Sequence, residues 1–319
     1  MANSRSLDLE NGLAQYVYII DNTSISITGD MSFECWANFE QLPSTAGAEM
    51  ALCCKGNALN SNESWQILIT QSDKLRVIFS EDGTSGDRTH WESTNAIIVS
   101  SDVGAWVHIA VTIDVSVPTI TMYKNTSSVG TTVTSSTATA IYDSNANLEF
   151  GRLEATSGFY LDGKLDEVRI WNILRTASEI STNYQRELAG NEANLQGYWQ
   201  LDNNYTDSTS NTNNLTPSGT PVFSTDVPFT DNTTTSTSTT STSTSTTTTS
   251  TSTTSTSSST STSTSTTTST STTATVTSTS TTTSTSTTST LTSTSTSTTT
   301  STTTSTTTTL DYRFVVERV

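Results

Sequence analysis

The sequence predicts an all-β domain, either a sandwich or a barrel, followed by a long tract of Ser and Thr. Runs rich in β-branched and aromatic residues recur along the first part of the chain, and turn residues separate them, at residues 16–20, 65–69, 75–79, 106–113 and 165–171. The short polar segment between the second and third of these runs is a hairpin signal. Because only one segment carries a helical signal, a fold of alternating strands and helices is excluded.

Weaker strand signals complete the pattern. Apolar and polar residues alternate over residues 33–37, and strand-forming residues continue at 119–123 and 147–151. The spacing of about ten residues between turn signals is typical of a sandwich or barrel. Cys35 lies in one of these runs and is expected to pack as a small apolar residue. With only three Cys, two of them adjacent, the sequence does not indicate a secreted disulfide scaffold.

The single helix is predicted to begin at Ala177 and to run for about two turns. Thr176 is followed three residues later by Glu179, which is the spacing of a capping box. The helix would place three apolar side chains on one face: Ile180, Tyr184 and Leu188.

Composition divides the chain into three parts. Residues 1–230 form the predicted domain, residues 231–309 a disordered Ser/Thr-rich stalk, and residues 310–319 an isolated strand-like tail that resembles the start of a further domain. The tract cannot fold by itself, because it has almost no apolar surface to offset the entropy lost on ordering. Tracts of this composition are typical of stalks on surface proteins.

The charge of the domain restricts its partners. The chain carries a formal net charge of −17; three of its 30 acidic and two of its 13 basic residues lie beyond residue 230, which leaves −16 for the domain. An acidic surface argues against nucleic acid, whose phosphates need cations. No segment is long and apolar enough to insert into a membrane. No apolar stretch typical of a signal peptide follows Met1, so we expect a protein without a cleaved signal or a fragment of a larger one.

Six segments, in order, carry a resemblance to a known family: SLDLENG (6–12), DMSFECWAN (30–38), CCKGN (53–57), GAWVHIAVTID (104–114), FYLDGKLDEVRIWNILRTASEI (159–180) and LQGYWQLDNN (195–204). Together they resemble the laminin-G-like domains of the concanavalin A-like lectin/glucanase superfamily. The resemblance implies a jelly roll of two antiparallel sheets, one concave and one convex, whereas the strand pattern alone leaves a sandwich or a barrel open.

The resemblance also implies a metal. Family members often bind Ca²⁺, and the first strand and the Asp-Glu strand are expected to be neighbours in this fold. Asp8, Asn11, the Gly12 carbonyl and Asp166 are therefore the candidate ligands, since Ca²⁺ prefers oxygen donors. The alternative is that Asp166 only forms hydrogen bonds within a turn.

Aromatic residues divide between core and candidate site. Trp36, Trp106, Trp171 and Trp199 are expected in the core, and His108 is expected to be a structural residue that points away from its apolar neighbours. His90 and Trp91 differ, because they follow the polar run at residues 82–89. An exposed Trp on a loop would offer a stacking surface for a sugar, so these two are the candidate ligand-binding residues.

The sequence does not predict an enzyme. Glucanases of the superfamily carry paired acids on one strand, as Glu-x-Asp-x-Glu, and that spacing is absent here. No serine hydrolase, metalloprotease or phosphate-binding motif is present either. A glycoside hydrolase therefore remains the weakest of the functions considered.

Two functions remain open. The first is a non-catalytic binding or adhesion module that is extracellular or displayed on a surface and recognises a glycan or a cell-surface protein. The second is a structural or assembly module of a surface layer or virion appendage, which would associate through residues 310–319. The ligand and the oligomeric state are not predicted.

Overall fold

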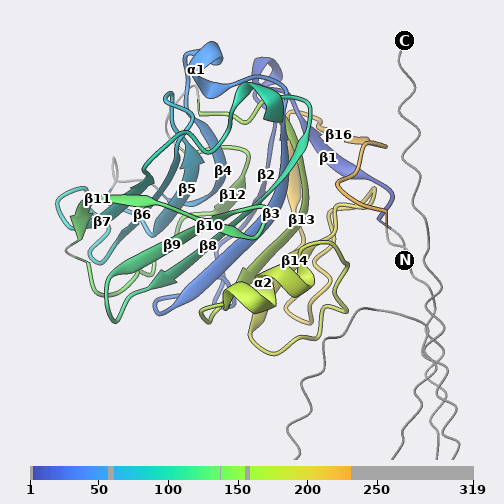
Figure 1. Ribbon diagram of the computed structural model, residues 1–319. Helices are drawn as coiled ribbons and strands as arrows, with labels where there is room; N and C mark the ends of the chain where they lie inside the picture. Colours follow the sequence, from blue (N-terminus) through green and yellow to red (C-terminus); the bar gives the residue numbers. More distant parts are fainter. Residues whose placement is uncertain (1–2, 57–60, 137, 155–158, 231–319) are drawn as a thin grey trace, which may run out of the picture. The chain divides into compact units, whose positions relative to one another are not determined.

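The computed structural model describes residues 3–56, 61–136, 138–154 and 159–230 (Figure 1). The predicted stalk at 231–309 and the strand-like tail at 310–319 lie outside the described residues. The described part is mostly β and forms two antiparallel sheets packed face to face, as the sequence predicts.

Sheet A has eight strands. Its hydrogen-bonded order is β10 (Ser127–Val129), β9 (Thr119–Lys124), β8 (Trp106–Asp114), β3 (Met31–Phe39), β13 (Gly163–Trp171), β1 (Ser6–Leu9) and β16 (Val222–Ser224), and β14 (Leu195–Trp199) pairs with β13. The first strand and the Asp-Glu strand are therefore neighbours, as the resemblance implies.

Sheet B also has eight strands. Its order is β11 (Thr131–Ser136), β7 (Arg88–Ser93), β6 (Leu75–Ser80), β5 (Trp65–Ile69), β4 (Met50–Lys55), β12 (Leu148–Phe150), β2 (Tyr16–Ile19) and β15 (Thr216–Ser218). Strands that are distant in sequence, such as β4 and β12, lie side by side, which is the connectivity of a jelly roll rather than a meander.

The predicted helix is α2 (Ala177–Asn183), which lies on the outer face of sheet A (Figure 1). Its capping box is confirmed, because the backbone N–H of Glu179 donates to Thr176 Oγ1 and the backbone N–H of Thr176 donates to Glu179 Oε2. The helix ends before Leu188, which packs in a separate cluster instead. A second helix of one turn, α1 (Pro43–Ala46), and the 3₁₀ turns η1 (Asn11–Leu13) and η3 (Ser100–Asp102) lie in connections. Among the described residues, no helix is long and apolar enough to cross a bilayer.

The main core lies between the two sheets and takes one side of their central strands. In β5, for example, Trp65, Ile67 and Ile69 point into this core, whereas Gln66 and Leu68 point out of the sandwich. The strand period of two residues therefore separates a core face from an outer face in each sheet. All three cysteines are buried thiols, as expected for Cys35.

Three of the four Trp predicted for the core are buried, namely Trp36, Trp171 and Trp199. The prediction is wrong for Trp106, which is partly exposed. Its indole Nε1 donates to Asp226 Oδ1 at 3.0 Å, because Trp106 begins β8 and faces out of sheet A. His108 is buried as a structural residue, with its ring 5.3 Å from that of Trp36.

Candidate functional site

A groove of about 670 Å³ lies on the outer face of sheet B. Strands β5, β6 and β7 supply its floor, because every second residue of each points away from the core. The lining residues are Glu49, Gln66, Leu68, Thr70, Gln71, Ser72, Arg76, Ile78, Ser85, Arg88, Glu92, Leu153 and Phe159. A volume in this range, with apolar residues and a few polar groups, is typical of a small-molecule site.

Strand register places the groove residues in rows. Gln66 on β5 lies opposite Ile78 on β6, which in turn lies opposite His90 on β7. In the neighbouring row, Arg76 lies between Leu68 and Glu92. Side chains directly opposite one another on one face are close enough to interact, so each row crosses the strands as a continuous surface.

Part of the groove lining is apolar. Leu153 and Phe159, from the segment that follows β12, pack on the outer face of sheet B against Ala51, Cys54 and Leu68. Phe159 is only partly buried and lines the groove. It therefore offers a solvent-accessible aromatic ring beside the polar rows.

Arg76 joins two acids across the groove. Its Nε donates to Glu92 Oε1 at 2.8 Å and its Nη1 donates to Glu49 Oε1 at 2.6 Å. Burial by itself would raise the pKa of Glu92, but the hydrogen bond and positive charge of Arg76 outweigh it and leave this pKa below its usual value. The guanidinium and the two carboxylates are therefore a fixed, charge-compensated unit.

Arg88 makes a second compensated pair at the same groove. Its Nη2 lies 2.6 Å from Oε2 of Glu63, whose side chain is fully buried. Burial raises the pKa of Glu63, and the hydrogen bond from Arg88 opposes that rise. The pair thus holds a buried acid beside a partly exposed guanidinium.

The structure separates the two candidate ligand residues, His90 and Trp91. His90 lies on the outer face, with Nε2 3.5 Å from Glu92 Oε1. Burial, with the charge of Arg76, lowers its pKa. Trp91 lies within β7, not on a loop, and packs against the main core. The strand alternation runs through residues 88–93, so these neighbours point to opposite faces and Trp91 is not the exposed stacking surface that the sequence suggested.

The predicted metal ligands come from β1, the turn η1 and β13. Asp166 is buried, with Oδ2 2.9 Å from Asn3 Nδ2 and Oδ1 accepting from the backbone N–H of Glu167. Asn11 begins η1, which also contains Gly12, and its backbone N–H donates to Asp162 Oδ1. Asp166 therefore forms hydrogen bonds, as in the alternative, but it lies within β13 and not in a turn.

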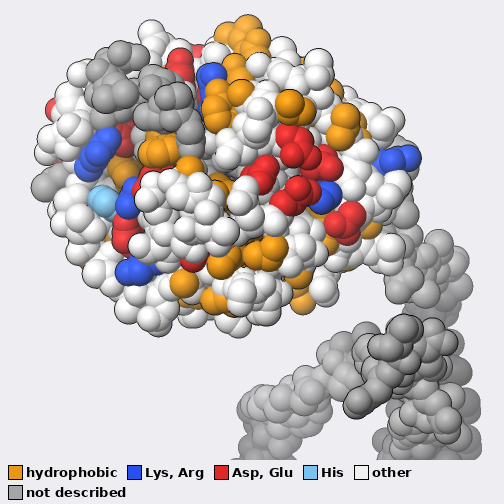
Figure 2. All heavy atoms as spheres, turned by 90° about the horizontal axis from the view of Figure 1, so that it is seen from above, with side chains coloured by type: hydrophobic (Ala, Val, Ile, Leu, Met, Phe, Trp, Pro, Cys, Tyr) orange, Lys and Arg blue, Asp and Glu red, His pale blue; other side chains and the backbone are white. Residues whose placement is uncertain are grey.

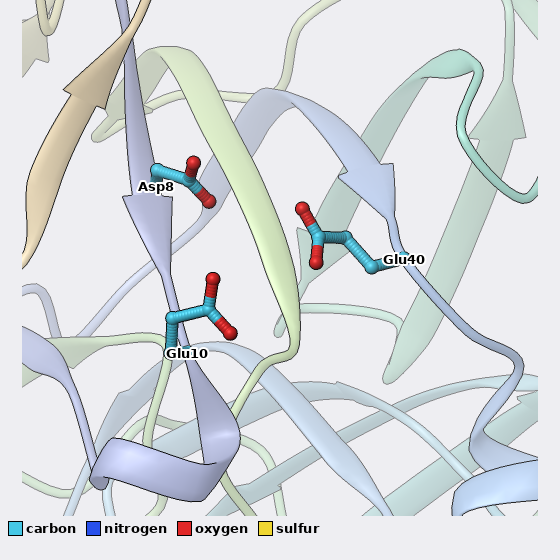
Figure 3. A group of neighbouring side chains, drawn as sticks. All are labelled: Asp8, Glu10 and Glu40. Atoms are coloured by element: carbon cyan, nitrogen blue, oxygen red, sulfur yellow. The ribbon is translucent and has the colours of Figure 1, made fainter.

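Asp8 instead belongs to a group of three acids. Carboxylate oxygens of Asp8, Glu10 and Glu40 all lie within 4.8 Å of one another (Figure 3). Asp8 lies in β1, and Glu10 directly follows that strand. Both side chains point toward Glu40 across the neighbouring strand (Figure 3). On the face seen from above, acidic side chains gather in a patch, whereas acidic and basic ones lie together at the end where β5, β6 and β7 lie (Figure 2).

A cation already accompanies this group. Lys164 Nζ lies 2.9 Å from Glu40 Oε1, and Lys164 is directly opposite Asp8 in the sheet. Burial raises the pKa of Asp8, Lys164 opposes the rise, and the neighbouring acids add to it. Of the predicted ligands, Asp8 lies in a group of oxygen donors suited to Ca²⁺, and Lys164 already contacts Oε1 of Glu40 in that group.

Sequence patterns could have identified part of the groove. The alternation at residues 75–79 places Arg76 and Ile78 on the face opposite Leu75, Val77 and Phe79. It does not say that Arg76 meets Glu49, which is 27 residues earlier in the chain. That contact depends on how segments distant in the sequence pack together in the tertiary structure.

Comparison with known proteins gives a family and a fold. Residues 11–181 match the Laminin_G_3 family model, described as the concanavalin A-like lectin/glucanases superfamily. No curated protein matches the chain in sequence.

Solved structures are similar in fold at low sequence identity. A Bacteroides ovatus protein provisionally described as carbohydrate binding has a TM-score of 0.51 and 15% identity over 72% of this chain; the match spans 62% of that protein's length. An SAP-like pentraxin from Limulus polyphemus has a TM-score of 0.41 and 10% identity, over 66% of this chain and 94% of its own. CBM40 of the Ruminococcus gnavus IT-sialidase has a TM-score of 0.42 and 10% identity, over 57% of this chain and 98% of its own.

Proposed function

Because this chain belongs to the laminin-G-like family of the concanavalin A-like lectin/glucanases superfamily, we propose that it is a non-catalytic binding module that takes a carbohydrate in the groove on the outer face of sheet B. The observation that carries the proposal is the composition of this groove. It combines an accessible aromatic ring and aliphatic side chains with amides, hydroxyls and charge-paired groups.

This combination suits a sugar. The C–H face of a pyranose packs against apolar and aromatic surface, which Phe159, Leu68 and Ile78 offer. Its hydroxyl groups need donors and acceptors held in place, which Gln66 and Arg76 supply. The Bacteroides ovatus protein provisionally described as carbohydrate binding shares the fold, which is consistent with this assignment.

The acids of the groove favour binding over hydrolysis. A glycoside hydrolase needs one carboxylic acid that stays protonated to protonate the leaving group. Glu49 and Glu92 instead share the guanidinium of Arg76, and the pKa of Glu92 lies below its usual value. Glu92 is therefore suited to accept from a sugar hydroxyl rather than to protonate a leaving group.

We further propose that the module is displayed on a surface by the Ser/Thr tract. The last described residues run along sheet A, where Asp226 accepts hydrogen bonds from Trp106 and Asn38 and the ring of Phe229 lies 6.2 Å from that of Trp36. The groove lies on the other sheet. The Ser/Thr tract therefore follows residues that pack on sheet A and do not line the groove.

Calcium stays part of the proposal in a modified form. Of the predicted ligands, Asp8 alone lies in a group of carboxylates that could hold Ca²⁺, together with Glu10 and Glu40. Binding there would require Lys164 to release Glu40. A glycan screen with and without Ca²⁺ separates a glycan site that needs the ion from one that does not.

The test is a glycan-array screen of the full chain together with two matched Phe→Ala variants. Phe159→Ala removes the aromatic ring of the groove. Phe223→Ala removes an equally partly buried ring on β16, in the other sheet. We expect the wild type and Phe223→Ala to bind the same glycans, and Phe159→Ala to bind them at least about tenfold more weakly, which is the loss of about 1.4 kcal/mol.

Two other outcomes would contradict the proposal. Equal loss in both Phe variants would show that the groove is not the site. If the wild type binds no glycan with or without Ca²⁺, the carbohydrate proposal is wrong, and the structural or assembly module becomes the function to test, by measuring self-association of the full chain.

A further inference from the structure

We propose that the groove on sheet B selects neutral glycans and rejects those that carry a carboxylate, sulfate or phosphate group. The inference rests on the proposed carbohydrate-binding function and names the class of ligand for that same site. It follows from how the charges of the groove are paired, from the acceptor atoms that remain, and from the charge of the whole domain.

Among the described residues that line the groove, each basic group is paired with an acid. Arg76 is fixed by Glu49 and Glu92, and Arg88 is paired with the buried Glu63. The four charged residues of the lining are two arginines and two glutamates, so their formal charges cancel. An anionic sugar would have to displace a carboxylate from a guanidinium, and it would leave that carboxylate without its partner.

The two acids that hold Arg76 also offer acceptor atoms to the ligand. Arg76 engages Oε1 of both Glu49 and Glu92, and within the described part of the chain no hydrogen bond engages Oε2 of either residue. These side chains are 14% and 22% exposed. A sugar hydroxyl can donate to such an oxygen, whereas an anionic group brings a second acceptor and is repelled.

The domain adds a long-range contribution of the same sign. Its formal net charge is −16, since three of 30 acids and two of 13 bases lie beyond residue 230. A field of this sign lowers the local concentration of anions near the surface and slows their association. Neutral oligosaccharides do not experience this barrier.

The inference predicts a switch in specificity. Changing Glu49→Gln and Glu92→Gln together keeps hydrogen-bond acceptors for Arg76 but removes two negative charges, so its guanidinium becomes available to an anion. The matched control is Asp30→Asn with Asp143→Asn, which changes the net charge of the domain by the same amount. Neither residue lines the groove; Asn at position 30 can still accept from the Val115 N–H, and Asp143 is exposed.

The measurement is the dissociation constant of the full chain for the best neutral glycan of the array, and for the same glycan carrying one sialic acid or one sulfate. For the wild type and the Asp30/Asp143 control, we expect the acidic glycan to bind at least about tenfold more weakly than the neutral one. For the Glu49/Glu92 variant, we expect the affinity for the acidic glycan to rise by about tenfold or more, and to fall again at high salt.

Three results separate this inference from the proposed function. If the wild type binds the acidic glycan as tightly as the neutral one or more tightly, the inference is overturned and carbohydrate binding stands. If the Glu49/Glu92 variant has an unchanged melting temperature but gains no affinity for the acidic glycan, the inference is again overturned. If the double variant has a lowered melting temperature, Glu49→Gln alone replaces it in this test. If no glycan binds, the proposed function itself fails.

Discussion

Replacing Lys55 by methionine is expected to destabilise the domain strongly. Lys55 ends β4 and is fully buried. Its Nζ lies 2.5 Å from Asp21 Oδ1, 2.6 Å from the carbonyl oxygen of Ser144 and 3.0 Å from that of Ala146. Methionine has a similar length, so Lys55→Met keeps most of the packing and removes the charge and all three hydrogen bonds.

The expected loss follows from the groups left behind. A buried acceptor without a partner costs about 1–3 kcal/mol, and breaking a buried ion pair costs about 3–5 kcal/mol in total. We therefore expect the free energy of unfolding to fall by about 3–5 kcal/mol, against a total of roughly 5–15 kcal/mol for a typical domain. The melting temperature should fall by roughly 6–20 °C.

The assay is urea unfolding of the full chain, followed by tryptophan fluorescence, with the slope against denaturant checked for constancy. Lys124→Met is the matched control, because Lys124 Nζ is 2.7 Å from Asp102 Oδ2 but both side chains are partly exposed. We expect this control to lose less than about 1 kcal/mol. Equal losses for Lys55→Met and Lys124→Met would refute the reasoning that burial decides the cost.

Two further predictions concern pH and backbone geometry. Burial, helped by the charge of Arg169, lowers the pKa of His108 to about 3 in the folded state. The unfolded-state pKa is about 6.5, so between pH 6.5 and 5 only the unfolded chain takes up a proton at this residue. The free energy of unfolding of the wild type should therefore fall by about 2 kcal/mol over this range, and that of His108→Gln should not. Equal losses in the two proteins would contradict this prediction. Gly163 has φ +149°, and an added Cβ would lie 2.0 Å from the carbonyl oxygen of Asn38. Gly163→Ala should therefore cost at least about 3 kcal/mol in the same urea assay, whereas Gly29→Ala, with no atom within 4 Å of its added Cβ, should change stability by less than about 0.5 kcal/mol.

Much of the fold was predictable because it depends on local patterns. The strand period places Phe33, Cys35 and Ala37 on the core face of β3, and the structure has them there. The capping box of Thr176 and Glu179 involves residues three apart, so it can be read without knowing what the helix packs against.

The candidate site was less predictable, and the errors have a common cause. Trp91 was expected on a loop because polar residues precede it, but strand β7 already includes it and turns its ring toward the core. Asp166 was expected to be a metal ligand or to bond within a turn, yet it lies in β13 and its carboxylate accepts a hydrogen bond from Asn3. In both cases the contacts that decide the outcome come from distant parts of the chain.

The sequence by itself determined that this is an all-β sandwich with one capped helix, since a period of two residues and a four-residue motif are local properties. Only the tertiary structure decided that Arg76 lies between Glu49 and Glu92, and that Asp8 faces Glu40. These pairings depend on which strands become neighbours and in what register. A shift of one residue would turn the strand residues among them, Asp8, Arg76 and Glu92, to the opposite face of their sheets.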